Sequence, residues 1–133
     1  DFDQSYYFPI ETISIPDIKG NKANYIYSKT YTGNGKLYGY FNVPGYVSNP
    51  PDYVNDKSMQ TFEIDVYNKT VKKMNFDGTT GWSCSQCKAG DYMVFGMAST
   101  QGTGYYLYNY KEDKYEPLKI KTEGNPFKIQ YLK

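Results

Sequence analysis

Short segments of alternating polar and apolar residues, each bounded by turn residues, run along most of this sequence. Alternation over a few residues is the pattern of a β-strand with one buried face. The run Gly33-Asn34-Gly35 tolerates positive φ and predicts a hairpin turn between the first two segments. The predicted strands of the first half span residues 24–31, 36–43, 59–67 and 70–76. In the second half, one strand starts at 82–84 ahead of a turn at 88–90, and others span 91–98, 105–110, 114–121 and 127–132.

The composition also favours sheet over helix. Aromatic residues make up 19% of the 133 residues, and 17 residues are tyrosine. Aromatic side chains suit a pleated, half-buried surface. Leucine and alanine, on which helical bundles depend, are scarce. We therefore predict an all-β chain.

The charged residues argue against two classes of function. The net charge is +1, and all 15 basic residues are lysines. A nucleic-acid-binding protein normally carries a basic surplus and uses arginine to contact phosphate and guanine. The sequence also has no histidine, which removes the commonest general base and the commonest neutral metal ligand. We expect no nucleic-acid partner, no metal, no cofactor and no enzymatic activity.

Part of the strand pattern occurs twice. Residues 62–74 align with residues 106–118 at an offset of 44, and residues 36–41 align with residues 91–96 at an offset of 55. The difference between the offsets reflects the extra length of the loop at residues 43–58. The sequence therefore predicts two copies of a four-strand unit.

A unit of about 45 residues with four antiparallel strands is typical of a β-propeller blade. Closed propellers usually have about four to eight blades, so we expect a partial propeller: one all-β domain or a propeller fragment. The alternative is a small antiparallel β-sandwich or barrel. The predicted divisions are the tail of a preceding blade at 1–22, blades at 23–78 and 79–122, and a terminal closing strand at 123–133.

The two cysteines, Cys84 and Cys87, form a C-x-x-C pair with three interpretations. A thioredoxin-like redox site needs a helix at the pair, whereas the flanking residues here are strand-like. A zinc site needs further cysteine or histidine ligands, which the sequence lacks. We predict a local disulfide, or two free thiols that hold a loop.

The expected setting is oxidising and extracytoplasmic. No stretch approaches the roughly 18–20 apolar residues that span a bilayer. The sequence opens on Asp1, as a mature or trimmed product would. Many polar turns in a chain rich in tyrosine, asparagine and glycine fit an exported protein.

Three segments carry a family resemblance: residues 31–36 (YTGNGK), 64–71 (IDVYNKTV) and 121–129 (KTEGNPFKI). In this order they resemble the closing blades of β-propeller surface lipoproteins of Bacteroidota, of the DUF4374 type, over residues 3–133. Known members capture iron–siderophore complexes at the cell surface beside an outer-membrane transporter. The resemblance implies a siderophore-capturing module at the outer-membrane surface. Its implied partners are the transporter and further propeller blades from another chain or chain segment.

The loop at residues 43–58 is the most conspicuous candidate for a binding site. Loops longer than about 12 residues in a compact domain are often functional. Tyrosines on such a loop offer flat apolar area with a polar tip, suited to stacking on catecholate rings or sugar faces. In the alternative, the loop tyrosines cover a blade edge and Trp82 lies in the core. The predicted ligand-binding residues are Tyr46, Asp52, Tyr53, Asn55 and Trp82.

Three kinds of function remain open. One is purely structural, a repeat piece that packs against another chain. The leading prediction is a surface module that binds an iron–siderophore complex, a glycan or a partner protein. The rival is a carboxylate-based glycan hydrolase or lyase, which needs two acids facing one cleft. A third use of the loop is a calcium site from Asp52, Asp56, Asn49 and Asn55, although their spacing differs from an EF-hand loop.

Overall fold

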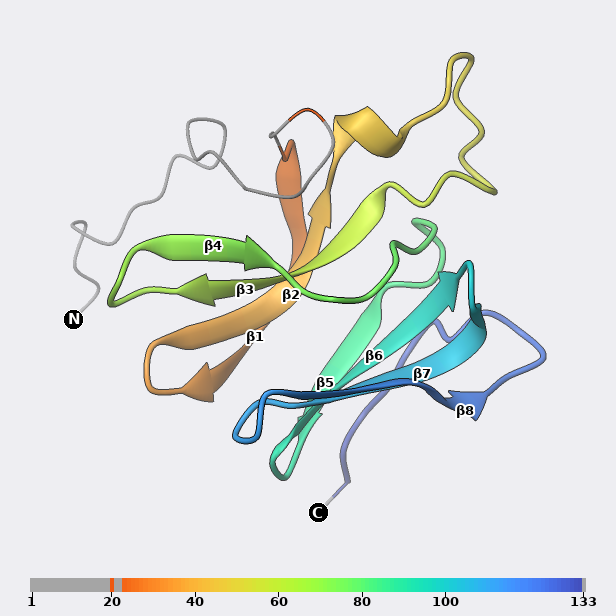
Figure 1. The fold of residues 1–133 in the computed structure, drawn as a ribbon. Coiled ribbons are helices and arrows are strands. Elements are labelled where there is room, and N and C mark those ends of the chain that lie inside the picture. Colours follow the sequence, from red (N-terminus) through yellow and green to blue (C-terminus); the bar gives the residue numbers. More distant parts are fainter. Residues whose placement is uncertain (1–19, 21–22, 133) are drawn as a thin grey trace.

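The computed structural model describes Gly20 and residues 23–132. These residues form two four-stranded antiparallel sheets (Figure 1), which confirms the all-β prediction. Strands that are adjacent in a sheet are also adjacent in sequence. A 3-10 helix labelled η4 (Pro44–Tyr46) follows the second strand. The first sheet contains β1 (Tyr25–Gly33), β2 (Lys36–Asn42), β3 (Met59–Asp65) and β4 (Thr70–Lys73), and the second contains β5 (Ser85–Ala89), β6 (Tyr92–Ser99), β7 (Gly102–Asn109) and β8 (Lys114–Lys121).

At one end of the first sheet, tight turns join β1 to β2 and β3 to β4 (Figure 1). At the corresponding end of the second sheet, tight turns join β5 to β6 and β7 to β8. Asn34 and Gly90 lie in the first turn of each sheet, with φ values of 53° and 60°. Lys69 and Asp113 lie in the last turn of each sheet, with φ values of 54° and 51°. Such left-handed residues let a short hairpin follow the twist of its strands. The two sheets therefore use matching turns.

The strand registers show that the two sheets repeat one another. Leu37 pairs with Ile64 in the first sheet, and Met93 pairs with Tyr108 in the second. When the hairpin turns are matched, corresponding residues lie 56 apart in the second strands and 44 apart in the third. The predicted offset of 55 is thus wrong by one residue. Because a slip of one residue moves every side chain to the opposite face, that alignment paired residues of opposite faces.

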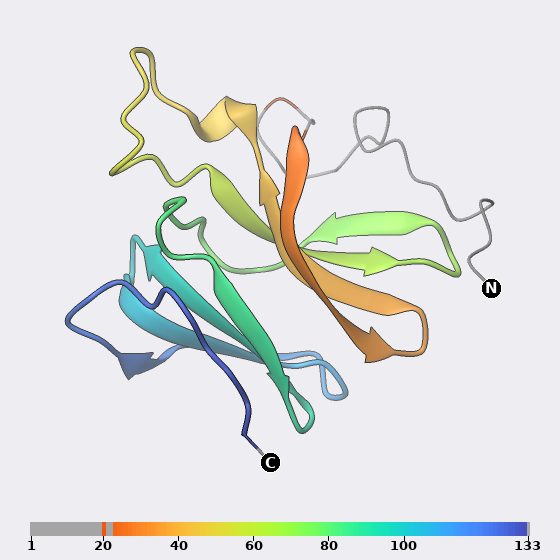
Figure 2. The ribbon, with the colours of Figure 1, turned by 180° about the vertical axis from the view of Figure 1, so that it is seen from behind.

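The two sheets face each other across an aromatic core. Their first strands, β1 and β5, lie side by side (Figure 2). Tyr40 meets Phe95 edge to face, with ring centroids 5.6 Å apart. Side chains of both sheets and of the segment between them fill this layer: Tyr38, Tyr40, Met59, Met74, Phe76, Cys84, Met93, Phe95, Met97, Tyr106 and Tyr108.

The Tyr40 hydroxyl links the sheets directly. Its side chain is fully buried, and the hydroxyl lies 3.1 Å from the carbonyl oxygens of both Ser85 and Gly96, to which it donates. Burial raises the pKa of Tyr40, so the hydroxyl stays protonated and able to donate. Gln86 of β5 adds a second link, because its side-chain oxygen accepts hydrogen bonds of 3.0 Å from the backbone N–H and the hydroxyl of Thr30 on β1.

The other face of the first sheet is apolar as well. Phe41 and Phe62 lie there with ring centroids 4.4 Å apart, and both are buried. Ala23, Val43 and Val71 complete the cluster. The central strands β2 and β3 are therefore buried on both faces, which explains why they lack strict polar–apolar alternation.

The ends of the chain differ from the predicted layout. The predicted tail at residues 1–22 lies outside the described residues, apart from Gly20. The strand predicted to start at residues 82–84 is present but starts later, because β5 begins at Ser85. Within the described residues no helix is long and apolar enough to cross a membrane.

The predicted closing strand at 123–133 is wrong, since its described residues, 123–132, are not in a strand. The segment runs beside the second sheet (Figure 2), where the Pro126 carbonyl accepts a hydrogen bond of 2.6 Å from the Ser85 hydroxyl. Pro126 has no N–H to donate to a strand ladder. It packs instead over Gly96, where an added Cβ would lie 2.9 Å from it.

Replacing Tyr40 by phenylalanine is expected to lower the free energy of unfolding by about 1 to 3 kcal/mol, because two buried carbonyls lose a donor. Urea unfolding followed by circular dichroism measures this difference. The matched control is Tyr27→Phe, whose side chain is 55% exposed on β1. It should change the free energy by less than about 0.5 kcal/mol. Equal effects of the two substitutions would contradict a linking role for Tyr40.

Candidate functional site

The loop at residues 43–58 is held by its own two aspartates. Asp52 accepts hydrogen bonds from the backbone of Val54 and Asn55 and, at 2.9 Å, from the Asn55 side chain. One oxygen of Asp56, Oδ2, accepts hydrogen bonds from the Ser48 amide, the Ser48 hydroxyl and the Asp52 amide at 3.0 to 3.1 Å. These hydrogen bonds lower the pKa of both carboxyl groups. The aspartates therefore shape the loop.

Hydrogen bonds also hold the segment that leads into β5. Thr79 is fully buried, and its backbone exchanges two hydrogen bonds with Met59 at the start of β3. Its hydroxyl accepts a hydrogen bond from the Ala98 amide at 2.8 Å and donates to the Ser83 carbonyl at 2.9 Å. Trp82 lies between these anchored residues, with its side chain 57% exposed. The backbone under the indole is thus fixed.

A pocket of about 460 Å³ lies between the loop and the segment that leads into β5. Three exposed aromatic side chains line it: Tyr25 (51% exposed), Tyr53 (73%) and Trp82 (57%). Exposed aromatic side chains that gather around one hollow form a contiguous apolar surface, and such surfaces mark ligand-binding grooves. The remaining lining residues are Asn24, Asn42, Val47, Asp56, Ser58, Met59 and Gly81.

Polar side chains form a row along this pocket. The Asn24 amide nitrogen lies 3.3 Å from the Asn42 side-chain oxygen, to which it donates. The Asn42 amide nitrogen in turn lies 3.3 Å from the Ser58 hydroxyl oxygen. Amides and hydroxyls both donate and accept, so they can exchange partners with hydroxyl groups of a ligand. The pocket combines flat apolar surfaces with neutral hydrogen-bonding groups.

The structure brings together only some of the predicted ligand-binding residues. Tyr53 and Trp82 share the pocket, and the alternative that Trp82 lies in the core is wrong. Tyr46 packs instead against the apolar cluster on the far face of the first sheet. Asp52 and Asn55 hydrogen-bond to each other and are not among the lining residues.

Sequence reasoning missed Tyr25 and the three polar residues that contact one another. Tyr25 begins β1 and pairs with Asn42 at the end of β2. The predicted hairpin already contained the signal, since the open end of a hairpin lies next to the loop that leaves it. The strand ends and the loop, considered together, would have identified Tyr25 and Asn42.

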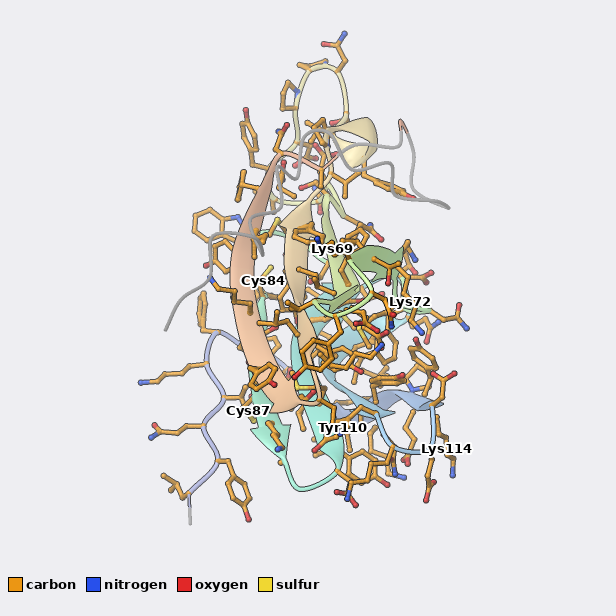
Figure 3. The ribbon with its side chains drawn as sticks, turned by 90° about the vertical axis from the view of Figure 1, so that its left-hand side faces the viewer. Lys69, Lys72, Cys84, Cys87, Tyr110 and Lys114 are labelled. Atoms are coloured by element: carbon orange, nitrogen blue, oxygen red, sulfur yellow. The ribbon has the colours of Figure 1, made fainter. Side chains whose placement is uncertain are left out.

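Cys84 and Cys87 are free thiols, so the predicted local disulfide is absent. Three residues of extended chain span about 10 Å, whereas bridged cysteines have Cα atoms about 4.4–6.8 Å apart. Figure 3 shows the two cysteines apart, with Cys84 just before β5 and Cys87 within it. Cys84 is buried and donates to the Thr80 carbonyl at 3.2 Å, and burial raises its pKa to about 12.

No group of three or more acidic, cysteine or histidine side chains that could hold a metal ion occurs within the part of the chain that the structure describes. The candidate calcium ligands in the loop are engaged otherwise. Both Asp52 and Asp56 direct oxygens to backbone N–H groups of the loop itself. The loop is therefore held by hydrogen bonds among its own residues.

Replacing Asp56 by alanine is expected to speed amide hydrogen exchange at Ser48 and, less strongly, at Asp52, because both amides lose Asp56 as an acceptor and the Asp52 amide keeps the Ser48 hydroxyl. In the unsubstituted chain, the lowered pKa of Asp56 means that protection is complete above the ordinary value of 3.8 and is lost as the pH falls through the folded value. Hydrogen exchange read by NMR from pH 7 downward measures both effects. Glu112→Ala, in the β7–β8 turn, is the control. Unchanged exchange in the Asp56 variant would contradict the assigned role.

In the folded chain, iodoacetamide is expected to modify Cys87 before Cys84, since Cys87 is partly exposed and Cys84 is buried with the higher pKa. Fragment-ion mass spectrometry distinguishes the two positions. Unfolding in urea should expose both thiols to the reagent without added reductant. A chain that takes up label only after reduction would contain the disulfide and contradict the free-thiol structure.

Comparison of the chain with protein-family models, with curated proteins and with solved structures found no match. The resemblance to surface lipoproteins therefore stays a prediction from sequence.

Proposed function

We propose that this chain is a ligand-binding module whose aromatic pocket takes a ring-shaped ligand. One observation carries the proposal: Tyr25, Tyr53 and Trp82 surround a single pocket with exposed side chains over a polar row. Flat faces of sugars and of aromatic rings stack on such side chains. Amide and hydroxyl groups beneath them fix the orientation of a ligand.

The acid in this pocket supports binding over catalysis. A glycosidase needs one carboxylic acid with a raised pKa and a second carboxylate across the cleft. Asp56 has a lowered pKa, and its Oδ2 already accepts three hydrogen bonds from the loop. It is also the one acid among the described lining residues. The Asp56 carboxylate therefore supports the loop structure and is not suited to donate a proton.

The charge of the pocket favours a glycan over a ferric siderophore. The described lining residues include Asp56 and no lysine. A ferric catecholate is anionic, because its deprotonated oxygens outnumber the charges on the iron, and it would meet no cation here. A neutral sugar meets no such repulsion. The iron–siderophore complex, with an outer-membrane transporter as partner at the cell surface, is the second candidate and rests on the sequence resemblance.

The sheet arrangement supports two blades of a larger β-propeller as the architecture. Blades stack face to face with their first strands nearest the axis, and β1 and β5 are neighbours here. At the repeat offset of 56, Gly96 of the second sheet corresponds to Tyr40 of the first sheet. The second sheet covers the face of the first sheet on which Tyr40 lies. By this correspondence, further blades from another chain or chain segment would extend the cover of the Gly96 face, over part of which Pro126 already packs.

Trp82 is the sole tryptophan, so its fluorescence reports on this pocket. Titration with neutral oligosaccharides, such as cellohexaose and mannohexaose, is expected to change its emission in a saturable way. Ferric enterobactin is the arm that tests the second candidate. Replacing Tyr53 by alanine should weaken binding about tenfold, because one stacking surface is lost.

Tyr27→Ala is the matched control, since Tyr27 is also an exposed tyrosine (55%, on β1) but does not line the pocket. It should leave the affinity unchanged. A response to ferric enterobactin alone would favour siderophore capture over glycan binding. The absence of a response to every ring-bearing ligand, with the far-ultraviolet spectrum intact, would overturn the proposal.

A further inference from the structure

A second and larger cavity, of about 910 Å³, lies at the hairpin-turn end of the sheets, away from the 43–58 loop. Its walls come from both sheets, including Lys72 of β4 and Tyr110 after β7 (Figure 3). Unlike the aromatic pocket, it is rich in cationic side chains. Four lysines line it against two acids: Lys36, Lys72, Lys88 and Lys111 against Glu63 and Asp91.

Most of these charges are matched within the cavity wall. Glu63 is buried and accepts hydrogen bonds from Tyr38 at 2.8 Å and from Lys36 at 2.9 Å. Lys36 also pairs with Asp65, at 2.8 Å. Lys111 pairs with Asp91 at 2.7 Å. Lys36 and Lys111 therefore already have carboxylate partners.

Lys88 differs from the other lysines of the cavity. Its Nζ donates to the Thr32 carbonyl at 3.3 Å and lies 5.8 Å from the ring centroid of Tyr110. Among the described residues it has no salt bridge with a carboxylate. Lys72 has only a long ion pair, 3.8 Å from a Glu63 oxygen that Lys36 already holds at 2.9 Å. The cavity therefore has one uncompensated cation and one weakly compensated cation.

Two tyrosine rings line the cavity together with Lys88 and Lys72. Tyr110 lies beneath Lys88, with its hydroxyl fixed by donation to the Gly90 carbonyl at 2.8 Å. Tyr131 lines the same cavity and is 58% exposed. An ammonium group beside an aromatic ring matches a ligand that carries a negative group on a ring-shaped body.

We propose that this cavity is a second binding site, for a small anionic ligand with a carboxylate or phosphate group, which Lys88 and Lys72 contact. Charge-assisted hydrogen bonds from ammonium to carboxylate or phosphate are short and strong. Tyr110 and Tyr131 contact the uncharged part of the ligand. The site stands independently of the aromatic pocket, because the two share no lining residue.

Three probes, trigalacturonate, inorganic phosphate and the neutral maltotriose, are titrated into the isotope-labelled full chain. Binding is read from the backbone amide shifts of Asn34 and Gly90. We expect saturable shifts with one or both anions and none with maltotriose. The trigalacturonate and phosphate arms show which anionic group the site takes. Shifts by maltotriose equal to those by the anions, or no saturation by either anion at millimolar concentration, would overturn the proposal.

Lys88→Gln is expected to weaken anion binding about tenfold, because it removes the uncompensated charge. Lys88→Arg keeps the charge and should retain binding. The matched control is Lys121→Gln, an exposed lysine of β8 outside the cavity. Equal affinities of the Lys88→Gln and Lys121→Gln variants would show unspecific attraction and contradict the site. Loss of structure in Lys88→Gln, checked by circular dichroism, leaves the Lys88→Arg comparison and the maltotriose arm to decide.

Discussion

The hydroxyl of Tyr40 crosses from the first sheet to the second and donates to the backbone of Ser85 and Gly96. Around it, aromatic side chains and methionines of both sheets form one buried layer. This layer sets how the sheets face each other, and both candidate sites depend on it. The aromatic pocket needs Trp82, next to the second sheet, close to the Tyr53 loop of the first. The cationic cavity needs lysines from both sheets at the opposite end.

The two sheets share a backbone plan but use their faces differently. Val71 and Tyr115, 44 residues apart, pair with residues that are likewise 44 apart, Ile64 and Tyr108. In the first sheet, the face that carries Ile64 and Val71 belongs to the cluster of Phe41 and Phe62. The equivalent face of the second sheet, which carries Tyr108 and Tyr115, belongs to the layer between the sheets. The bulk of the tyrosines fills the layer while their hydroxyls find partners, as Tyr108 does with Asp113 at 2.8 Å. This use accounts for the four tyrosines of the layer: Tyr38, Tyr40, Tyr106 and Tyr108.

Much of the fold could be predicted because turns and alternation are local signals. The turn at Asn34 and the third-strand offset of 44 follow from residue types alone. The face assignment did not, since the offset of 55 sets Tyr40 against Phe95, whereas the observed offset of 56 sets Tyr40 against Gly96. In the site, the loop suggested Tyr53, but Asp52 and Asn55 turned out to hydrogen-bond to each other. The exposure of Trp82 depends on how Thr79 fixes the backbone against both sheets, which is a long-range property.

The central claim is that a ring-shaped ligand binds at the loop end of the sheets. Amide and indole NMR signals of the labelled chain, recorded during titration with cellohexaose, test it most directly. The account predicts that the Trp82 indole and the amides of Tyr25 and Tyr53 shift with a common saturation curve. It also predicts that the amides at the hairpin-turn end, such as Gly90, stay in place. Shifts confined to the hairpin-turn end, or spread evenly over the chain, would contradict the account.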